Sequence, residues 1–241
     1  MMSWGVHAHE RVRPTEAFPT FSAVCGILGA ALGVARNDHC TRQAVRDSFS
    51  YAARLDDRIG EDGRVIQTQR IWDYQTVSRL VACEKRRPYI PVIGAFPPQR
   101  APRRLSKDGT KFADAAYTTM PTRREYVSDV VYTVLVEPLP GAEIPYDVFL
   151  QAVRKPLFRV SFGRANCLPT RPIFEAEVEA SSFTGAFAGI SPGAGTIWSP
   201  EASGAFRRTM VRDYPLFGTP ALYVERKVYV HFQERREEVA S

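Results

Sequence analysis

The chain has 241 residues, of which 44% are hydrophobic and 24% are charged, and its formal net charge is +6. This length allows one large domain or two small ones, and an aromatic content of 11% excludes a disordered chain. The longest apolar stretch, Val24 to Ala35, is too short to span a bilayer, and no secretion signal opens the chain, so we expect a cytoplasmic protein without membrane contact.

Residues 20–35 predict the first helix, because apolar residues recur there at the i, i+3, i+4 spacing of one buried face. A second stripe of the same helix carries almost no side chain: Ser22, Gly26, Gly29 and Gly33. Each glycine costs roughly 1 kcal/mol against alanine in a helix interior. The stripe therefore predicts that a neighbouring sheet, or else a ligand backbone, approaches this face closely, and we favour the sheet.

The remaining elements are predicted in chain order as a short helix 38–48, a strand 49–55 with a turn 60–63 and a partner strand 64–71, a strand 126–137, a helix 145–153, a half-buried strand 173–179, a loop 181–200, and an antiparallel pair 205–211 and 222–232. No regular βαβ repeat is present, which favours an α+β fold with antiparallel sheets. The cysteines Cys25, Cys40, Cys83 and Cys167 are scattered, which indicates free thiols rather than a zinc site or disulfides.

The positive charge is concentrated in residues 85–124, which we call the basic insertion. Its basic residues are Lys85, Arg86, Arg87, Arg100, Arg103, Arg104, Lys107, Lys111, Arg123 and Arg124. Against these ten stand only Asp108 and Asp114, so the insertion is +8 and the other 201 residues together are −2. Its prolines argue against a helix or a central strand. A stiff basic segment with apolar residues such as Phe96 is typical of a nucleic-acid-binding finger, and the alternative is a solvated basic loop.

Several motifs resemble one family when they are taken together. They are SWG at 3–5, RPTEAFPTFS at 13–22, CGILGAALGVARND at 25–38, WDYQTV at 72–77, REYVSDVVYTV at 124–134, AVRKPLFRVSFGRANCLPTRPIF at 152–174 and YVERKVYV at 223–230. In this order they resemble the CasD family, the "Cas five" subunit of the type I-E Cascade complex in CRISPR immunity. Members normally have an apolar strand before SWG, and here only Met1 and Met2 precede it.

The resemblance implies a ferredoxin-like domain of the RRM and RAMP type in residues 1–84 plus 125–160. It implies that the basic insertion 85–124 is a protruding thumb and that residues 161–241 form a small β-rich C-terminal part. It also implies a non-catalytic role in antiviral defence. The protein would hold the 5′ handle of the crRNA, contact the CasC backbone subunit and the CasA large subunit, and reach target DNA only through the complex. No cofactor or metal is implied.

The RNA-binding residues expected outside the insertion are Arg13, Thr20, Ser22, Arg36, Tyr74, Thr76 and Arg164. Backbone N–H groups at the first helix start, with Thr20 and Ser22, could receive a phosphate. Tyr74 could stack on a base or fill a core edge, and Arg164 could bind a phosphate or form a structural salt bridge. Within the insertion, the ten basic residues would hold phosphates and Phe96 would push bases apart. Six such contacts imply a log–log salt slope of about −4 for a single strand.

Two other functions remain open at this point. The first is a metal-independent endoribonuclease that processes pre-crRNA, for which His7, His9, Tyr74 and Lys111 are conceivable participants. No spacing in the sequence brings those four residues together. The second is a protein adaptor that binds no RNA and whose basic loop docks on an acidic subunit. A metal site at His7 and His9 is disfavoured, because no other ligand cluster accompanies them.

Overall fold

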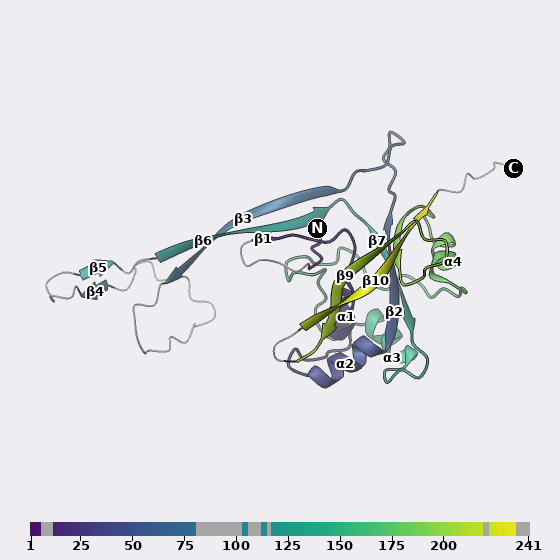
Figure 1. Cartoon of the computed structure of the whole chain (residues 1–241), viewed down its shortest axis with the longest axis horizontal. Helices are drawn as coiled ribbons and strands as arrows, with labels where there is room; N and C mark the ends of the chain where they lie inside the picture. The colour runs from purple at the N-terminus through teal and green to yellow at the C-terminus, as the bar shows by residue number, and fades with distance from the viewer. Residues whose placement is uncertain (6–11, 81–102, 106–111, 115–116, 219–221, 235–241) are drawn as a thin grey trace.

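The computed structural model describes residues 1–5, 12–80, 103–105, 112–114, 117–218 and 222–234 (Figure 1). For the described residues between 77 and 120 it gives the backbone only, and for the others the side chains as well. Its helices are α1 (Phe21–Ala31), α2 (His39–Asp47), α3 (Tyr146–Arg154) and α4 (Phe183–Ala188). Its strands are β1 (Val12–Arg13), β2 (Phe49–Asp56), β3 (Gln69–Leu80), β4 (Arg103–Leu105), β5 (Phe112–Asp114), β6 (Tyr117–Ser128), β7 (Tyr132–Pro138), β8 (Gly195–Ser199), β9 (Arg207–Leu216) and β10 (Leu222–Gln233). The mixture confirms the α+β class.

A five-stranded sheet with the order β7-β2-β8-β10-β9 forms the centre of the body, and all of its neighbouring strands are antiparallel. Phe49, Tyr51 and Ala53 of β2 share a core with side chains from α1, α2 and α3. On the opposite face of the same strand, Ala52 packs against α4 and against Ile197 of β8. Because side chains alternate along a strand, β2 is buried on both faces and forms the middle of the molecule.

The α1 helix is well specified locally, although it is shorter than the predicted 20–35. Thr20 precedes it with extended backbone and accepts a hydrogen bond from the Ala23 N–H, as an N-cap residue does. Its apolar residues, including Val24 and Leu28, are buried in the core that contains β2. The buried Cys25 thiol lies in the same core, and burial raises its pKa to about 12. Cys25, Cys40 and Cys167 are free thiols, as predicted, whereas Cys83 lies outside the described residues.

The expected close approach to the glycine stripe of α1 is wrong for Gly26 and Gly29, the two glycines within the helix. A Cβ atom added at Gly26 or Gly29 would meet nothing within 4 Å. Gly33 lies beyond the end of the helix, with φ +76, where it is needed for its backbone conformation and for the contact with Leu157. Helix α1 therefore packs through its apolar stripe. Gly26 is exposed, and Gly29 is buried without a neighbour close enough to require a glycine.

The strand 64–71 predicted as the partner of 49–55 is wrong. β2 pairs with β7 and β8, and β3 begins only at Gln69 and pairs with β6 instead. The single predicted strand 126–137 is two strands, β6 and β7, separated by a turn in which Asp129 adopts φ 55. A short glycine turn between two strands predicts that these strands pair with each other. Here the partners of β2, which are β7 and β8, lie much further along the chain.

Further predictions had mixed outcomes. The expected strand 173–179 is irregular chain, and the expected loop 181–200 contains both α4 and β8. The predicted closing pair is confirmed, since β9 and β10 are antiparallel neighbours. Helices α2 and α3 lie within one residue of the predicted positions. No helix in the described part of the chain is long and apolar enough to cross a membrane.

Candidate nucleic-acid interface

The strands β3 and β6 form a long antiparallel hairpin that leaves the body of the molecule (Figure 1). The pairing runs without interruption from Gln69 opposite Ser128 to Leu80 opposite Tyr117. The described parts of the basic insertion are β4, β5 and the first part of β6, and Figure 1 shows them on this hairpin and beyond its end, away from the body. The insertion was expected to contain no central strand, yet β6 lies between β1 and β3. Pro121 is tolerated because β1 pairs with β6 only at residues 123 and 124.

The base of the hairpin is held to the body by Glu125, whose side chain is buried. Its carboxylate accepts the backbone N–H of Thr15 at 2.9 Å and an N–H of Arg70 at 3.0 Å. The Ser3 hydroxyl donates to the Glu125 carbonyl, and Met2 exchanges two backbone hydrogen bonds with Val127 at 2.8 Å each. A buried carboxylate with its bonds satisfied fixes the direction in which the hairpin leaves the body.

The pair Gly163–Arg164 belongs to this base. Gly163 has φ +89, and a Cβ there would collide with the carbonyl oxygen of Ser3, so glycine is required. Arg164 donates to the carbonyls of Glu125 and Arg13 at 3.1 Å each and lies over the ring of Tyr126, 4.5 Å from its centroid. Arg164 was expected either to bind a phosphate or to form a structural salt bridge. This geometry favours the structural role, with carbonyls and an aromatic ring as partners in place of a carboxylate.

Tyr126 illustrates the electrostatics of this side of the base. Burial raises the pKa of Tyr126, but its hydrogen bond with Asn166 and the guanidinium of Arg164 outweigh that effect, so that its pKa is lowered overall. Arg13 and Arg124 are register partners on the same side. Three arginines, Arg13, Arg124 and Arg164, therefore gather on this face. All three are among the residues that the sequence predicted to bind RNA.

The opposite face of the hairpin base exposes aromatic side chains. Trp72 and Tyr74 are 50% and 60% exposed, and their two-residue spacing places them on the same side of β3. Arg123 lies directly opposite Tyr74 on β6, and Val12 of β1 lies beside Arg123. These four residues, which we call the aromatic platform, line a hollow of about 550 Å³.

The start of α1, expected to bind a phosphate, is already occupied. Thr20 is fully buried, and the Phe21 N–H donates to the carboxylate of Asp213 at 2.7 Å. A carboxylate at this position repels a phosphate and uses the backbone donor that would bind it. This geometry argues against the phosphate contacts expected of Thr20 and of the partly buried Ser22.

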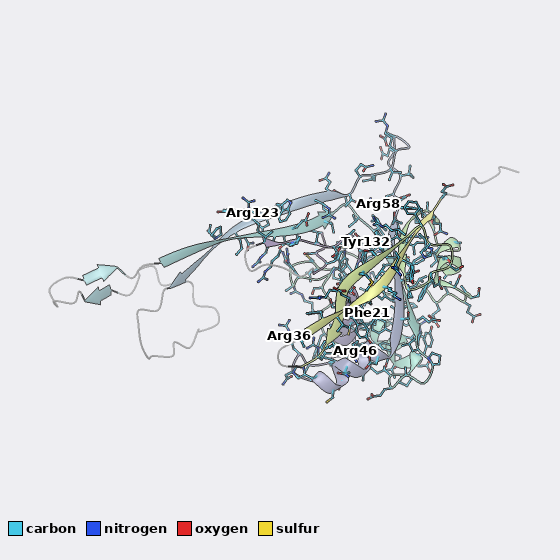
Figure 2. The ribbon with its side chains drawn as sticks, in the orientation of Figure 1. Phe21, Arg36, Arg46, Arg58, Arg123 and Tyr132 are labelled. Carbon is cyan, nitrogen blue, oxygen red and sulfur yellow. The ribbon has the colours of Figure 1, made fainter. Side chains whose placement is uncertain are left out.

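The other predicted residues are distributed unevenly. Arg36 is exposed near α2, well apart from Arg123 on the hairpin (Figure 2). Thr76 is exposed on β3, on the same side as Tyr74. Arg103 and Arg104 belong to β4. The residues that lie outside the described part of the chain are Lys85, Arg86, Arg87, Phe96, Arg100, Lys107, Lys111, His7 and His9.

Sequence reasoning missed Trp72, Arg70 and Val12. The sequence contained part of the information needed to find Arg70 and Trp72. Every second residue of a strand lies on the same face, which groups these two with Tyr74 and Thr76. Arg123 could not be placed beside Tyr74 without the register of β3 and β6, which no local pattern gives.

A larger hollow of about 740 Å³ lies between α2 and residues 139–143. Its lining includes Asp47 and Glu143, which would repel phosphate groups, and no arginine or lysine. Among the described residues there is also no group of three potential metal ligands. The charge and the exposed aromatic rings therefore identify the hairpin, rather than this larger hollow, as the candidate interface.

Comparison with known proteins gives a consistent result. The family model described as CRISPR-associated protein (Cas_Cas5) matches residues 1–239. The CRISPR system Cascade subunit CasD of Escherichia coli (strain K12) is 32% identical over 231 residues, which cover 95% of this chain and 91% of that protein. These matches confirm the resemblance to the CasD family.

Two solved structures share the fold. A chain of a CRISPR RNA-guided surveillance complex superimposes with a TM-score of 0.59 and 21% identity, covering 97% of this chain and 86% of the other. A structure described as a Cas protein gives a TM-score of 0.57 and 16% identity, covering 97% and 90%. With the family match over nearly the whole length, the chain belongs to the Cas_Cas5 family of CRISPR-associated proteins.

Proposed function

We propose that this protein is a non-catalytic subunit of a CRISPR Cascade surveillance complex that binds the 5′ handle of the crRNA. The observation that carries this proposal is the β3–β6 hairpin, which leaves the body and bears the described parts of a segment with eight net positive charges. A projecting hairpin of this charge can follow a sugar–phosphate backbone, because arginine and lysine bind phosphates without needing a particular base sequence. The E. coli relative is a subunit of Cascade, which supports assembly with other subunits.

The finer features of the proposal follow the same resemblance. The basic insertion 85–124 would be the thumb, whose charged residues hold phosphates while Phe96 separates bases. The thumb would also contact the CasC backbone subunit, and the protein would lie near the CasA large subunit. Target DNA would be reached only through the complex, which would act in the cytoplasm without membrane contact or cofactor.

We also infer a ferredoxin-like, RAMP-type arrangement for residues 1–84 plus 125–160, followed by the β-rich C-terminal part 161–241. Support comes from β2 and β7, which are antiparallel neighbours; α1 and α2 precede β2, the hairpin strands β3–β6 stand between β2 and β7, and α3 follows β7. Side chains of α1 and α3 join the same core on one face of β2. The strands β8, β9 and β10 of the C-terminal part continue the same sheet.

One pair of described side chains has the chemistry of a catalytic pair but is closed to RNA. Ser199 Oγ lies 3.0 Å from His231 Nε2, a contact that could suggest a nucleophile and its base. Both side chains are buried, with 1% and 4% exposure, so an RNA phosphate cannot reach them. Of the four residues considered for RNA cleavage, only Tyr74 is described.

The proposal is tested with Cascade assembled around this subunit. We expect the triple variant Arg100→Glu, Arg103→Glu, Arg104→Glu to abolish crRNA retention, measured as RNA that copurifies with the complex. The matched control changes the same charge on the body through Arg58→Glu, Arg207→Glu and Arg208→Glu, which are exposed arginines. Unchanged RNA retention in the variant of the basic insertion, or equal loss in both variants, would contradict the assignment of the thumb.

Two further measurements address the alternatives. Cleavage of repeat RNA by the pure protein without metal would favour the endoribonuclease. Assembly of the complex that survives nuclease treatment and needs no RNA would favour the protein adaptor.

A further inference from the structure

The aromatic platform, formed by Val12, Trp72, Tyr74 and Arg123, is unusual for its exposure. The three tryptophans of the chain are Trp4, Trp72 and Trp198. Trp4 is 2% exposed and Trp198 stacks on Phe18, whereas Trp72 is half exposed and Tyr74 still more so. Neither Trp72 nor Tyr74 stacks on another aromatic ring within the described part of the chain. Clustered exposed apolar side chains mark a binding surface more often than isolated ones do.

The geometry of the platform suits flat ligands. Residues two apart in a strand are separated by about 7 Å along it, so the side chains of Trp72 and Tyr74 stand next to each other on one face. Val12 adds an apolar floor at the edge of the same hollow. Aromatic rings presented in this way by a sheet are a general means of stacking unpaired bases.

The charges around the platform favour RNA over an apolar or basic protein partner. Arg123 lies directly opposite Tyr74 and forms no ion pair with any described residue. Among the described side chains of β1, β3 and β6 on that face, Glu125 carries the one carboxylate, which is buried and bound to Arg70. The strand that carries Arg123 leads directly into the rest of the basic insertion, so a chain of phosphates can follow β6 from the platform.

We propose that Trp72 and Tyr74 stack on an unpaired base of single-stranded RNA while Arg123 binds the adjoining phosphate. This inference rests on the proposed RNA-binding function and adds a base-binding site at the root of the hairpin. The basic insertion would supply most of the affinity that depends on salt, and the platform would supply a contribution that depends on bases and little on salt.

Trp72 provides its own probe, because stacking on a base changes the fluorescence of an exposed tryptophan while the buried Trp4 cannot respond by contact. The full chain is titrated with a short oligouridine RNA and with an oligoribonucleotide of the same length that lacks bases. We expect the oligouridine to quench the tryptophan fluorescence and the oligoribonucleotide without bases to leave it unchanged. Trp198→Phe should keep the quenching, whereas Trp72→Phe should lose it and still bind RNA with nearly unchanged affinity.

Trp72→Ala should weaken oligouridine binding about 5- to 150-fold, measured by anisotropy of a labelled RNA, since one base–aromatic stack contributes that range. Arg123→Gln should reduce both the affinity and its salt dependence without removing the quenching at saturation. Circular dichroism verifies the fold of each variant, and the conservative Trp72→Phe variant keeps the test valid if Trp72→Ala fails to fold.

The outcomes separate the two proposals. If the wild-type chain binds oligouridine with strong salt dependence but without quenching, and Trp72→Ala binds equally well, the platform proposal is overturned and the proposed function stands. If the wild-type chain binds no RNA at all, the proposed function itself fails. If Trp72→Ala binds RNA normally but no longer joins the other Cascade subunits, the platform is a protein contact and the stacking proposal is wrong.

Discussion

Arg54 is a single charged residue on which three parts of the body depend. Its guanidinium is fully buried, 2.6 Å from a carboxylate oxygen of Asp56, and it donates to the carbonyl of Phe187 at 2.6 Å and to that of Ile190 at 3.0 Å. Thr133 donates to the other Asp56 oxygen at 2.6 Å. The residue thus joins β2 to the end of α4 and, through Asp56, to β7.

We expect Arg54→Met to lower the free energy of unfolding by about 3–5 kcal/mol, because it leaves the Asp56 carboxylate buried without its cation. Urea denaturation monitored by circular dichroism measures the change. Adding Asp56→Asn to this variant should restore part of the stability, since the unpaired charge disappears. Arg207→Met, at an exposed position, serves as the control and should change stability little. A small loss from Arg54→Met would show that the ion pair is dispensable.

The elements of the body meet at the start of α1, where the β9–β10 hairpin supplies a carboxylate. The carboxylate of Asp213 on β9 accepts a hydrogen bond from the Phe21 N–H. It also accepts two hydrogen bonds from Arg226 on β10, at 2.7 and 2.9 Å. Arg226 also donates to the Tyr51 hydroxyl of β2 at 2.7 Å. A helix end, a hairpin and the central strand therefore share one buried network.

We expect Asp213→Ala to cost about 3–5 kcal/mol of unfolding free energy, because it leaves the largely buried Arg226 without its partner. Asp213→Asn keeps an acceptor for the Phe21 N–H and should cost less. Glu201, which accepts the Phe183 N–H at the start of α4, gives a comparison, and Glu201→Ala should cost only about 1 kcal/mol. Thermal unfolding of the three variants measures the order. Equal losses for the alanine and asparagine variants at Asp213 would contradict a role for its charge.

Elements defined by local chemistry could be predicted from the sequence, and those defined by distant partners could not. The helices α2 and α3 were located well because their periodicity and their N-terminal residues Asp38 and Pro145 are local signals. The pairing of β2 with β7 and β8 depends on burial of both faces of β2, and the glycine turn at 60–63 pointed to a nearer strand. The basic insertion was visible as composition, whereas the aromatic platform needed the register of Tyr74 with Arg123.

For the molecule as a whole, the excess positive charge lies in one stretch of the chain, and the core clusters of the body are built from other residues. Helices α1–α4 and strands β2 and β8 supply these clusters, and residues 76–121 carry the charge. That stretch holds nine basic and three acidic residues, so its removal would change the formal net charge from +6 to zero. Gln75 and Thr122 are register partners, which allows an Asn-Gly turn to join them directly.

We expect this excision variant to unfold at nearly the same temperature as the wild-type chain, because the body keeps its core. Its binding to oligouridine should lose most of its salt dependence, because eight of the ten basic residues of the insertion have been removed and only Arg123 and Arg124 remain. Calorimetry and anisotropy at several salt concentrations measure the two effects. A strongly destabilised variant would show that the removed segment is part of the core, and RNA binding with unchanged salt dependence would place the phosphate contacts on the body.

The attachment of the hairpin through Glu125, Ser3 and Arg164 has a consequence for exchanging segments between relatives. Because these contacts lie at its root, the outer end can change in length and charge without disturbing the packing on which folding depends. A segment exchanged between relatives at residues 76 and 121 would therefore change the outer end of the hairpin and leave the root contacts and the fold of the body as they are.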